Sequence, residues 1–225
     1  MTANIKENQV KSRERVANHG EVYTSSREVN AMLDLVKQET ERIDSRFLEP
    51  ACGTGNFLTE ILNRKLTVVE HRYKRSRLEY EKYSVLAVSS LYGIDILEDN
   101  VRECRHRLYE IFISRHDSLF DEPAREEYKD AAEYILSKNI IWGDALTLRT
   151  VGKNPTPIVF SEWSVVNDNK IKRRDFTMEH LVNTYSTIDP EPNLFSDLGD
   201  NVAIPKSVKE YSPVHFLRLP DVERQ

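Results

Sequence analysis

The stretch FLEPACGTGNFL, residues 47–58, decides the fold that the sequence predicts. Apolar residues lead to an acid at Glu49, and a turn with glycines at positions 53 and 55 follows. Apolar residues then return at the spacing of one helix face, and they are Phe57, Leu58, Ile61, Leu62 and Leu66. This order predicts a short strand that ends at Glu49, a tight turn and an amphipathic helix.

The alternation of strand and helix continues along the chain. Apolar runs at 91–96, 139–146 and 156–163 predict three further strands, and helical patterns separate the first three strands. Such alternation gives an α/β fold with a mostly parallel sheet and helices on both faces. Ligands of these sheets bind outside the carboxyl ends of the strands, where we expect Glu49, Asp95 and Asp144.

The remaining segments predict two further helical segments, a hairpin and the division of the chain into an arm, a domain and a tail. Ser25 and Glu28 form a capping-box pattern that starts a helix near Ser26. The charged segment 70–83 predicts an exposed helical insertion, and residues 164–176 predict a hairpin that turns at 167–169. We therefore expect a flexible arm over 1–20, one domain over 21–176, and an irregular tail over 177–225 that docks on a partner.

The turn itself limits the ligands that the predicted site accepts. Gly53 and Gly55 allow a sharp turn and a close approach of the backbone to a ligand, but a G-x-G pair alone is a weak signal. A dinucleotide fingerprint needs a third glycine where Leu58 stands, and the Gly-Lys-Ser/Thr of a phosphate loop is absent. An acid at Glu49 disfavours a diphosphate and suits a cation, such as an ammonium or a sulfonium.

Residues 49–58, EPACGTGNFL, closely resemble the cofactor motif of S-adenosylmethionine-dependent adenine-N6 DNA methyltransferases of restriction-modification systems. Residues 22–29, VYTSSREV, resemble the upstream Y-T-P-x-x-[IV] element of that family, with Ser25 in place of the usual proline. Residues 91–96 and 141–146 resemble the second and third strand motifs. The resemblance covers about residues 20–150, in the order that the family uses, and implies a class I (Rossmann-like) methyltransferase fold.

The resemblance implies S-adenosylmethionine as the cofactor and gives its contacts residue by residue. Glu49 and the turn at 51–55 would meet the amino-acid end of the cofactor, Asp95 the ribose hydroxyls, Ile96 the adenine ring and Asp144 the adenine amine. Cys52 is interpreted as a small buried filler and not as a nucleophile. The implied cofactor-binding residues are Tyr23, Thr24, Glu49, Ala51, Cys52, Gly53, Gly55, Asn56, Phe57, Asp95, Ile96, Asp144 and Ala145.

Composition limits the class of protein and the cellular compartment that we expect for this chain. The chain has 225 residues, 31% of them charged, and a net charge of −5, which argues against coating nucleic acid by bulk charge. Two distant cysteines predict no disulfide framework, and scattered histidines predict no metal site. No segment resembles a membrane span or a signal peptide. The sequence therefore predicts a soluble cytoplasmic protein without a metal or a membrane.

The sequence departs from the family at the catalytic motif, [DNS]-P-P-[YFW], because it contains no paired prolines. At the expected place it has Phe160-Ser161-Glu162-Trp163, in which Glu162 and Trp163 are weak substitutes and a plain strand end is the preferred interpretation. The tail is also too short for a target-recognition domain. Basic residues near the predicted hairpin would touch DNA phosphates or form a solvated turn; they are Lys170, Lys172, Arg173 and Arg174.

Three functions stay open on the sequence alone. The first is the cofactor-binding half of a split adenine-N6 DNA methyltransferase, whose companion protein supplies an NPPY-type catalytic loop and target recognition. The second is a catalytically inactive module with the methyltransferase fold. The third is a methyltransferase for a substrate other than DNA. The apolar pair in residues 191–195 is a further candidate for contact with a partner.

Overall fold

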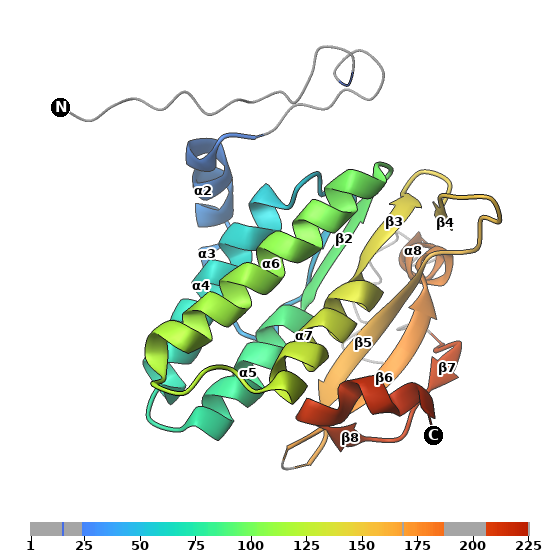
Figure 1. Cartoon of the computed structure of the whole chain (residues 1–225). Helices are drawn as coiled ribbons and strands as arrows, with labels where there is room; N and C mark the ends of the chain where they lie inside the picture. The colour runs from blue at the N-terminus through green and yellow to red at the C-terminus, as the bar shows by residue number, and fades with distance from the viewer. Residues whose placement is uncertain (1–14, 16–23, 168, 187–205, 225) are drawn as a thin grey trace, which may run out of the picture.

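The computed structural model describes Arg15 and residues 24–167, 169–186 and 206–224 (Figure 1). Its first sheet has the order β1-β2-β3-β4. Strands β1 (Phe47–Glu49), β2 (Leu91–Asp95) and β3 (Ile140–Asp144) are parallel, and β4 (Arg149–Thr150) closes one edge antiparallel to β3. The α/β class and the parallel pairing of the first three predicted strands are therefore confirmed.

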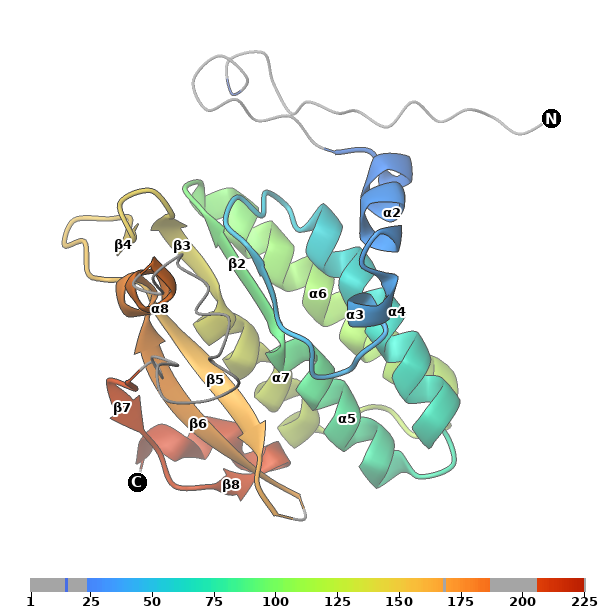
Figure 2. The same cartoon turned by 180° about the vertical axis from the view of Figure 1, so that it is seen from behind.

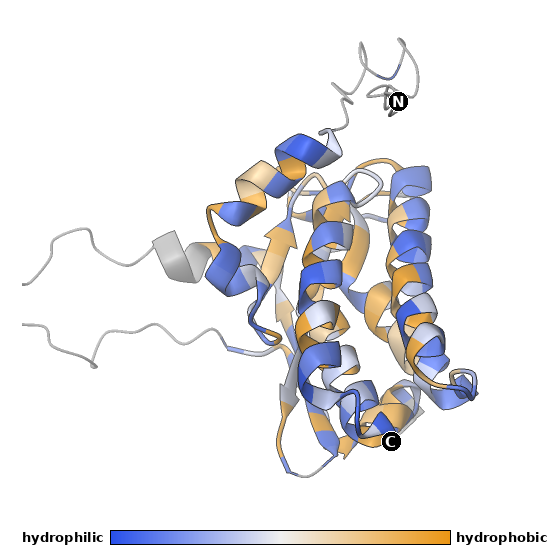
Figure 3. Cartoon of the chain, turned by 90° about the vertical axis from the view of Figure 1, so that its left-hand side faces the viewer, coloured by the Kyte–Doolittle hydropathy of each residue, from blue (hydrophilic) through white to orange (hydrophobic). Residues whose placement is uncertain are grey.

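Long helices cover one face of this sheet. In Figure 1, α6 lies in front of β2, and in the opposite view of Figure 2 β2 lies in front of α6. Figure 3 shows hydrophilic residues along their outer surfaces. Between residues 24 and 139 the helices are α2 (Ser26–Asp34), α3 (Lys37–Thr40), α4 (Asn56–Tyr73), α5 (Arg77–Ser89), α6 (Glu98–Leu119) and α7 (Glu126–Asn139).

Side chains of β2 alternate between two apolar clusters, as expected for a strand buried on both faces. Leu91 joins the main core with α4, α6 and α7, whereas Tyr92 and Ile94 pack against Ile158, Phe160 and Met178. The second face of the sheet is therefore covered by β5 and the start of α8 (Met178–Ser186), and not by a second layer of long helices. Of the helices expected on both faces, the second face has α8, which packs there together with β5.

The fourth predicted strand belongs to a different sheet. Strand β5 (Val159–Val165) pairs antiparallel with β6 (Lys170–Thr177), and the predicted hairpin between them is confirmed. Near its start, Ile158 lies against Gly143 at the carboxyl end of β3, and Trp163 donates from Nε1 to Asn139 Oδ1 just before β3. Strand β5 therefore runs opposite to β3 and does not extend the parallel sheet.

The charged segment 70–83 is helical and partly exposed, as expected, but it belongs to the end of α4 and the start of α5 and is not an insertion. Helix α4 continues to Tyr73, Ser76 Oγ accepts from the Glu79 amide, and the next helix buries Glu81 completely. Glu81 Oε1 is 2.8 Å from Arg77 Nε and 3.3 Å from His116 Nε2. The predicted solvated face is found at residues 71, 72, 74–76 and 78, and the prediction is wrong at Tyr80 and Glu81, which are buried.

Residues 206–224 are not an irregular tail. They form β7 (Lys209–Glu210) and β8 (Val214–His215), both paired with β6, and a 3-10 helix, η1 (Phe216–Arg224), that packs on α7. Phe216, Leu219 and Val222 are buried in the main core. Residues 206–224 therefore share the main core with residues that precede the expected domain boundary at residue 176. Residues 191–195 lie outside the described residues. No helix of the described ranges has both the length and the apolar composition to cross a membrane.

Lys65 on α4 is fully buried and holds the segment before β1 in place. Its ammonium donates to the carbonyls of Ile43 and Ser45 and to Ser90 Oγ (2.6 Å). Burial lowers the pKa of Lys65 to about 7, because the charged form loses its hydration and gains no buried carboxylate.

We predict that Lys65 makes stability rise with pH. Its pKa is about 7 when folded and about 10.4 when unfolded, so between these values the unfolded chain binds more protons. The free energy of unfolding, measured by urea titration, should therefore increase relative to Lys65→Met by up to ~1.4 kcal/mol per pH unit over this window. A constant difference between the two proteins from pH 7 to 10 would contradict the buried charge.

Candidate functional site

The glycine turn between β1 and α4 is fastened to the end of β2. The Gly53 amide donates to Asp95 Oδ2 at 2.8 Å, and the Cys52 amide donates to the Ile94 carbonyl at 2.8 Å. Gly53 and Gly55 have φ values of 53° and 89°, in the left-handed region that side chains avoid. The sequence prediction of a tight turn after Glu49 is confirmed.

Asp95 is the residue on which the turn depends. It is 8% exposed, and its Oδ1 accepts from the Leu97 amide (2.9 Å) and from Asn100 Nδ2 (3.3 Å). A carboxylate offers about four acceptor positions, so Asp95 keeps capacity for a further hydrogen bond. Asn100 was missed from the sequence because a lone Asn in the first turn of a helix resembles any surface residue.

The glycines also make room for packing below the turn. A Cβ on Gly55 would lie 2.6 Å from Cys104 Sγ, and one on Gly93 would lie 3.0 Å from Cys52 Sγ. Gly55 is therefore required by the protein interior, which differs from the predicted role of close approach to a ligand. The contact with Cys104, together with burial, raises the pKa of the Cys52 thiol far above its usual range, so Cys52 stays protonated.

Two neighbouring segments hold the outer side of the turn. Asn56 Nδ2 donates to the Thr24 carbonyl (3.0 Å), which brings the segment before α2 to the turn. Arg107 on α6 donates from Nη1 to the Thr54 carbonyl (2.7 Å) and to Asn56 Oδ1 (2.8 Å). Arg107 was not predicted, since nothing in the helical spacing distinguishes it from other surface arginines. Tyr23 lies outside the described residues.

The other predicted cofactor residues lie along the carboxyl edge. Burial raises the pKa of Glu49, whose Oε1 accepts weakly from the Ala51 amide at 3.4 Å. The Leu146 amide, which donates to Asp144 Oδ1 at 2.9 Å, lowers the pKa of Asp144. Ile96 is 48% exposed beside Asp95, so an apolar side chain is offered to solvent at this edge.

Two residues of the predicted set are held partly inside the fold. Phe57 packs on the main core, and Ala145 packs on the cluster around Tyr92. Leu146, which was not predicted, is 94% exposed next to Asp144. The edge thus combines three carboxylates with exposed apolar side chains.

The two weak catalytic candidates are remote from this edge. Trp163 is 4% exposed and bonded to Asn139, at the opposite end of β3 from Asp144. Glu162 pairs with Arg46, which precedes β1, and with Arg174. A five-residue strand is roughly 16 Å long, so neither side chain is brought together with Asp95 and Asp144.

The predicted DNA-contacting cations are largely paired within the protein. Lys172 binds Glu210 (2.7 Å) and Arg174 binds Glu162 (2.5 Å), while Lys170 is exposed. Arg173 is 4% exposed, so its predicted contact with DNA phosphates is wrong.

Arg173 is instead the centre of a buried network. Its guanidinium forms two 2.8 Å bonds to Asp175 and one 2.7 Å bond to Glu223, and lies 4.4 Å from the Tyr211 ring centroid. Hydrogen bonds from Lys138 and Arg173 lower the pKa of Glu223 to about 2. The network joins β6 to η1.

Comparisons with protein-family models, with curated proteins and with solved structures give no match for this chain. Within the described ranges, no group of three or more His, Cys, Asp or Glu side chains is arranged to hold a metal ion.

We predict that Arg173→Met destabilises the fold by about 3–5 kcal/mol, because it leaves the Asp175 carboxylate buried without its partner. Lys170→Met is the matched control, since this exposed lysine on the same strand should change stability by less than about 0.5 kcal/mol. Urea unfolding of the two variants measures the difference. Equal stabilities would show that Arg173 is not a structural cation.

Proposed function

We propose that this chain is the S-adenosylmethionine-binding half of a split adenine-N6 DNA methyltransferase. The observation that carries the proposal is the carboxyl edge of the parallel sheet, where Glu49, Asp95 and Asp144 follow three adjacent strands and the Gly53 turn is fixed on Asp95. Open α/β sheets bind ligands at this edge.

The residues at this edge fit the parts of that cofactor. When bound, S-adenosylmethionine supplies a methyl group on a sulfonium centre, and its amino-acid end carries an ammonium that suits the Glu49 carboxylate. The remaining acceptor position of Asp95 suits a ribose hydroxyl. The exposed Ile96 side chain offers an apolar surface to a purine ring, and Asp144 offers an acceptor to its amine.

In the part of the chain that the structure describes, the same edge lacks the groups that would hold a target base. Catalysis at an adenine amine requires acceptors and a stacking ring that fix the nitrogen near the methyl group. Within the described residues, Glu162 and Trp163 lie toward the other end of the sheet. A companion polypeptide with an Asn-Pro-Pro-Tyr-type loop would supply these groups, together with recognition of the DNA sequence.

One observation favours an inactive binding module as the alternative. Asp95 already accepts three hydrogen bonds from the protein, so it serves the turn whether or not a ribose is present. A methyltransferase for a substrate other than DNA is the remaining alternative, and the assays below separate the three.

We predict that titration calorimetry detects one S-adenosylmethionine site per chain. Glu49→Gln should weaken binding by about 1.5–3 kcal/mol, roughly tenfold to hundredfold, because a charge-assisted contact to the ammonium is lost. Affinity for the wild type should fall as pH decreases through the raised pKa of Glu49, and the variant should lack this dependence. Glu98→Gln, an exposed acid at the start of α6, is the control. Binding unaffected by Glu49→Gln would remove Glu49 from the site.

We predict that the isolated chain transfers no methyl group to DNA. Tritium transfer from labelled cofactor should stay at background for the chain alone and appear when a companion with the catalytic loop is added. Strong transfer by the pure chain that is lost in Glu162→Ala would contradict the split arrangement. Cofactor binding without transfer under either condition would favour the inactive module.

A further inference from the structure

A groove of about 480 Å³ lies over the face of the parallel sheet that carries Leu48 and Tyr92, between this face and the second sheet. Its volume falls within the range of about 300–1,000 Å³ that is usual for small-molecule sites. The apolar lining comes from β1, β2, β5, β6 and α8, and it includes Leu48, Tyr92, Phe160, Phe176, Met178 and Val182. Tyr92, Phe160, Phe176 and Met178 are at most 9% exposed, so the groove has buried walls.

The aromatic walls of the groove offer no free polar side-chain atom. The Tyr92 hydroxyl donates to the Ser161 carbonyl at 2.9 Å, and its ring meets the Phe160 ring edge-on with 5.4 Å between the centroids. The other lining side chains of this part are hydrocarbon or thioether. Because an unpaired polar group is costly to bury, a molecule that enters the groove must be apolar along these walls and must keep its polar group at the charged end.

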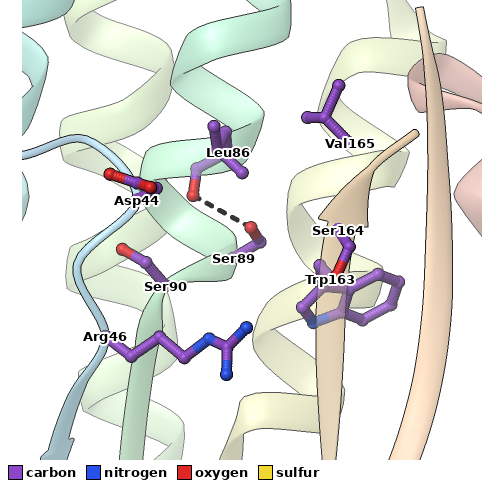
Figure 4. Close-up of a pocket in the computed structure, with 8 residues that line it drawn as sticks. All are labelled: Asp44, Arg46, Leu86, Ser89, Ser90, Trp163, Ser164 and Val165. Carbon is purple, nitrogen blue, oxygen red and sulfur yellow. Dashed lines mark hydrogen bonds between the residues drawn. The ribbon is translucent and has the colours of Figure 1, made fainter. Parts of the chain in front are cut away.

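The charged end of the groove carries an excess of one positive charge. Arg46 and Arg174 both pair with the single acid Glu162, which is 13% exposed in its side chain. Among the described residues Glu162 alone accepts a hydrogen bond from Arg46, whereas a guanidinium has five N–H donors. In Figure 4, Arg46 extends from the segment before β1 toward Trp163 on β5, beside a second cavity of about 280 Å³. Arg46 therefore has donors left for a second carboxylate.

We propose that this groove binds a small molecule with a compact apolar body and one carboxylate. The body lies between Leu48 and Phe176, and the carboxylate pairs with Arg46, since a guanidinium binds a carboxylate through two parallel hydrogen bonds. An extended peptide fits less well, because its backbone amides and carbonyls would find no partners along the apolar walls. The acids of the carboxyl edge, Glu49, Asp95 and Asp144, do not line the groove, so the inference does not rest on the proposed function.

The test titrates the full chain with 2-naphthoate and follows the methyl groups of methionine by NMR. The sequence has three methionines, at positions 1, 32 and 178. The methyl signal of Met178, which lines the groove, should shift and saturate at one 2-naphthoate per chain. Met32 on α2 is the internal control, since it is 55% exposed away from the groove and its signal should stay unchanged.

Matched variants separate the charge from the apolar walls. Arg46→Met should weaken binding of 2-naphthoate by about tenfold and leave 2-naphthamide, which has the same body without the charge, unaffected. Leu48→Trp should fill the groove and abolish binding of both molecules. Leu78→Trp on α5 is its control, because Leu78 has a similar exposure of 41% and does not line the groove. Val182→Trp on α8 is a second filling variant in case Leu48→Trp does not fold.

Several results would overturn the inference. One is a Met178 signal that 2-naphthoate does not shift, and another is binding that persists in the folded filling variants. Equal weakening of 2-naphthoate and 2-naphthamide by Arg46→Met would overturn it by removing the role of the charge. Binding that appears only after residues 190–203 are deleted would assign the groove to that segment of the chain. Displacement of 2-naphthoate by S-adenosylmethionine would place both molecules at the cofactor edge. None of these results counts against cofactor binding itself, which calorimetry with S-adenosylmethionine measures separately.

Discussion

The hydrogen bonds of the Asp95 carboxylate are the interaction on which the candidate site depends. One oxygen holds the amide of the glycine turn, and the other holds the first turn of α6 through Leu97 and Asn100. A single buried acid thus fixes the spacing between the loop after β1 and the helix after β2. The same side chain thus sets the shape of this edge and places a carboxylate at it.

The direction of β5 determines what this edge lacks. In an open parallel sheet, groups that act on a ligand come from the carboxyl ends of neighbouring strands. Strand β5 runs the other way, which buries Trp163 against α7 and directs Glu162 to Arg46. After Val165 a short hairpin leads into β6, and β5 pairs with β6 within the second sheet. The carboxyl edge of the parallel sheet and the face between β1 and β5 are therefore lined by different groups.

The sequence predicted well wherever a residue acts through local pattern. The Ser25–Glu28 cap, the glycine turn and the three acids at strand ends follow from spacing and backbone geometry, which the order of residues records. The prediction failed where polar or charged side chains pair although they are far apart in the sequence. Glu81 with His116 and Arg173 with Glu223 look like surface charges in the sequence, because each partner lies 35 or more residues away. The same distance hides the direction in which β5 runs.

The packing of η1 on α7 has a consequence for how the protein is made. Phe216, Leu219 and Val222 complete the main core, yet they are synthesised after every other element that they touch. During translation α7 lacks this cover until residues 216–222 have left the ribosome. The core is therefore completed late in the order of synthesis, and the apolar surface that η1 covers is exposed until then.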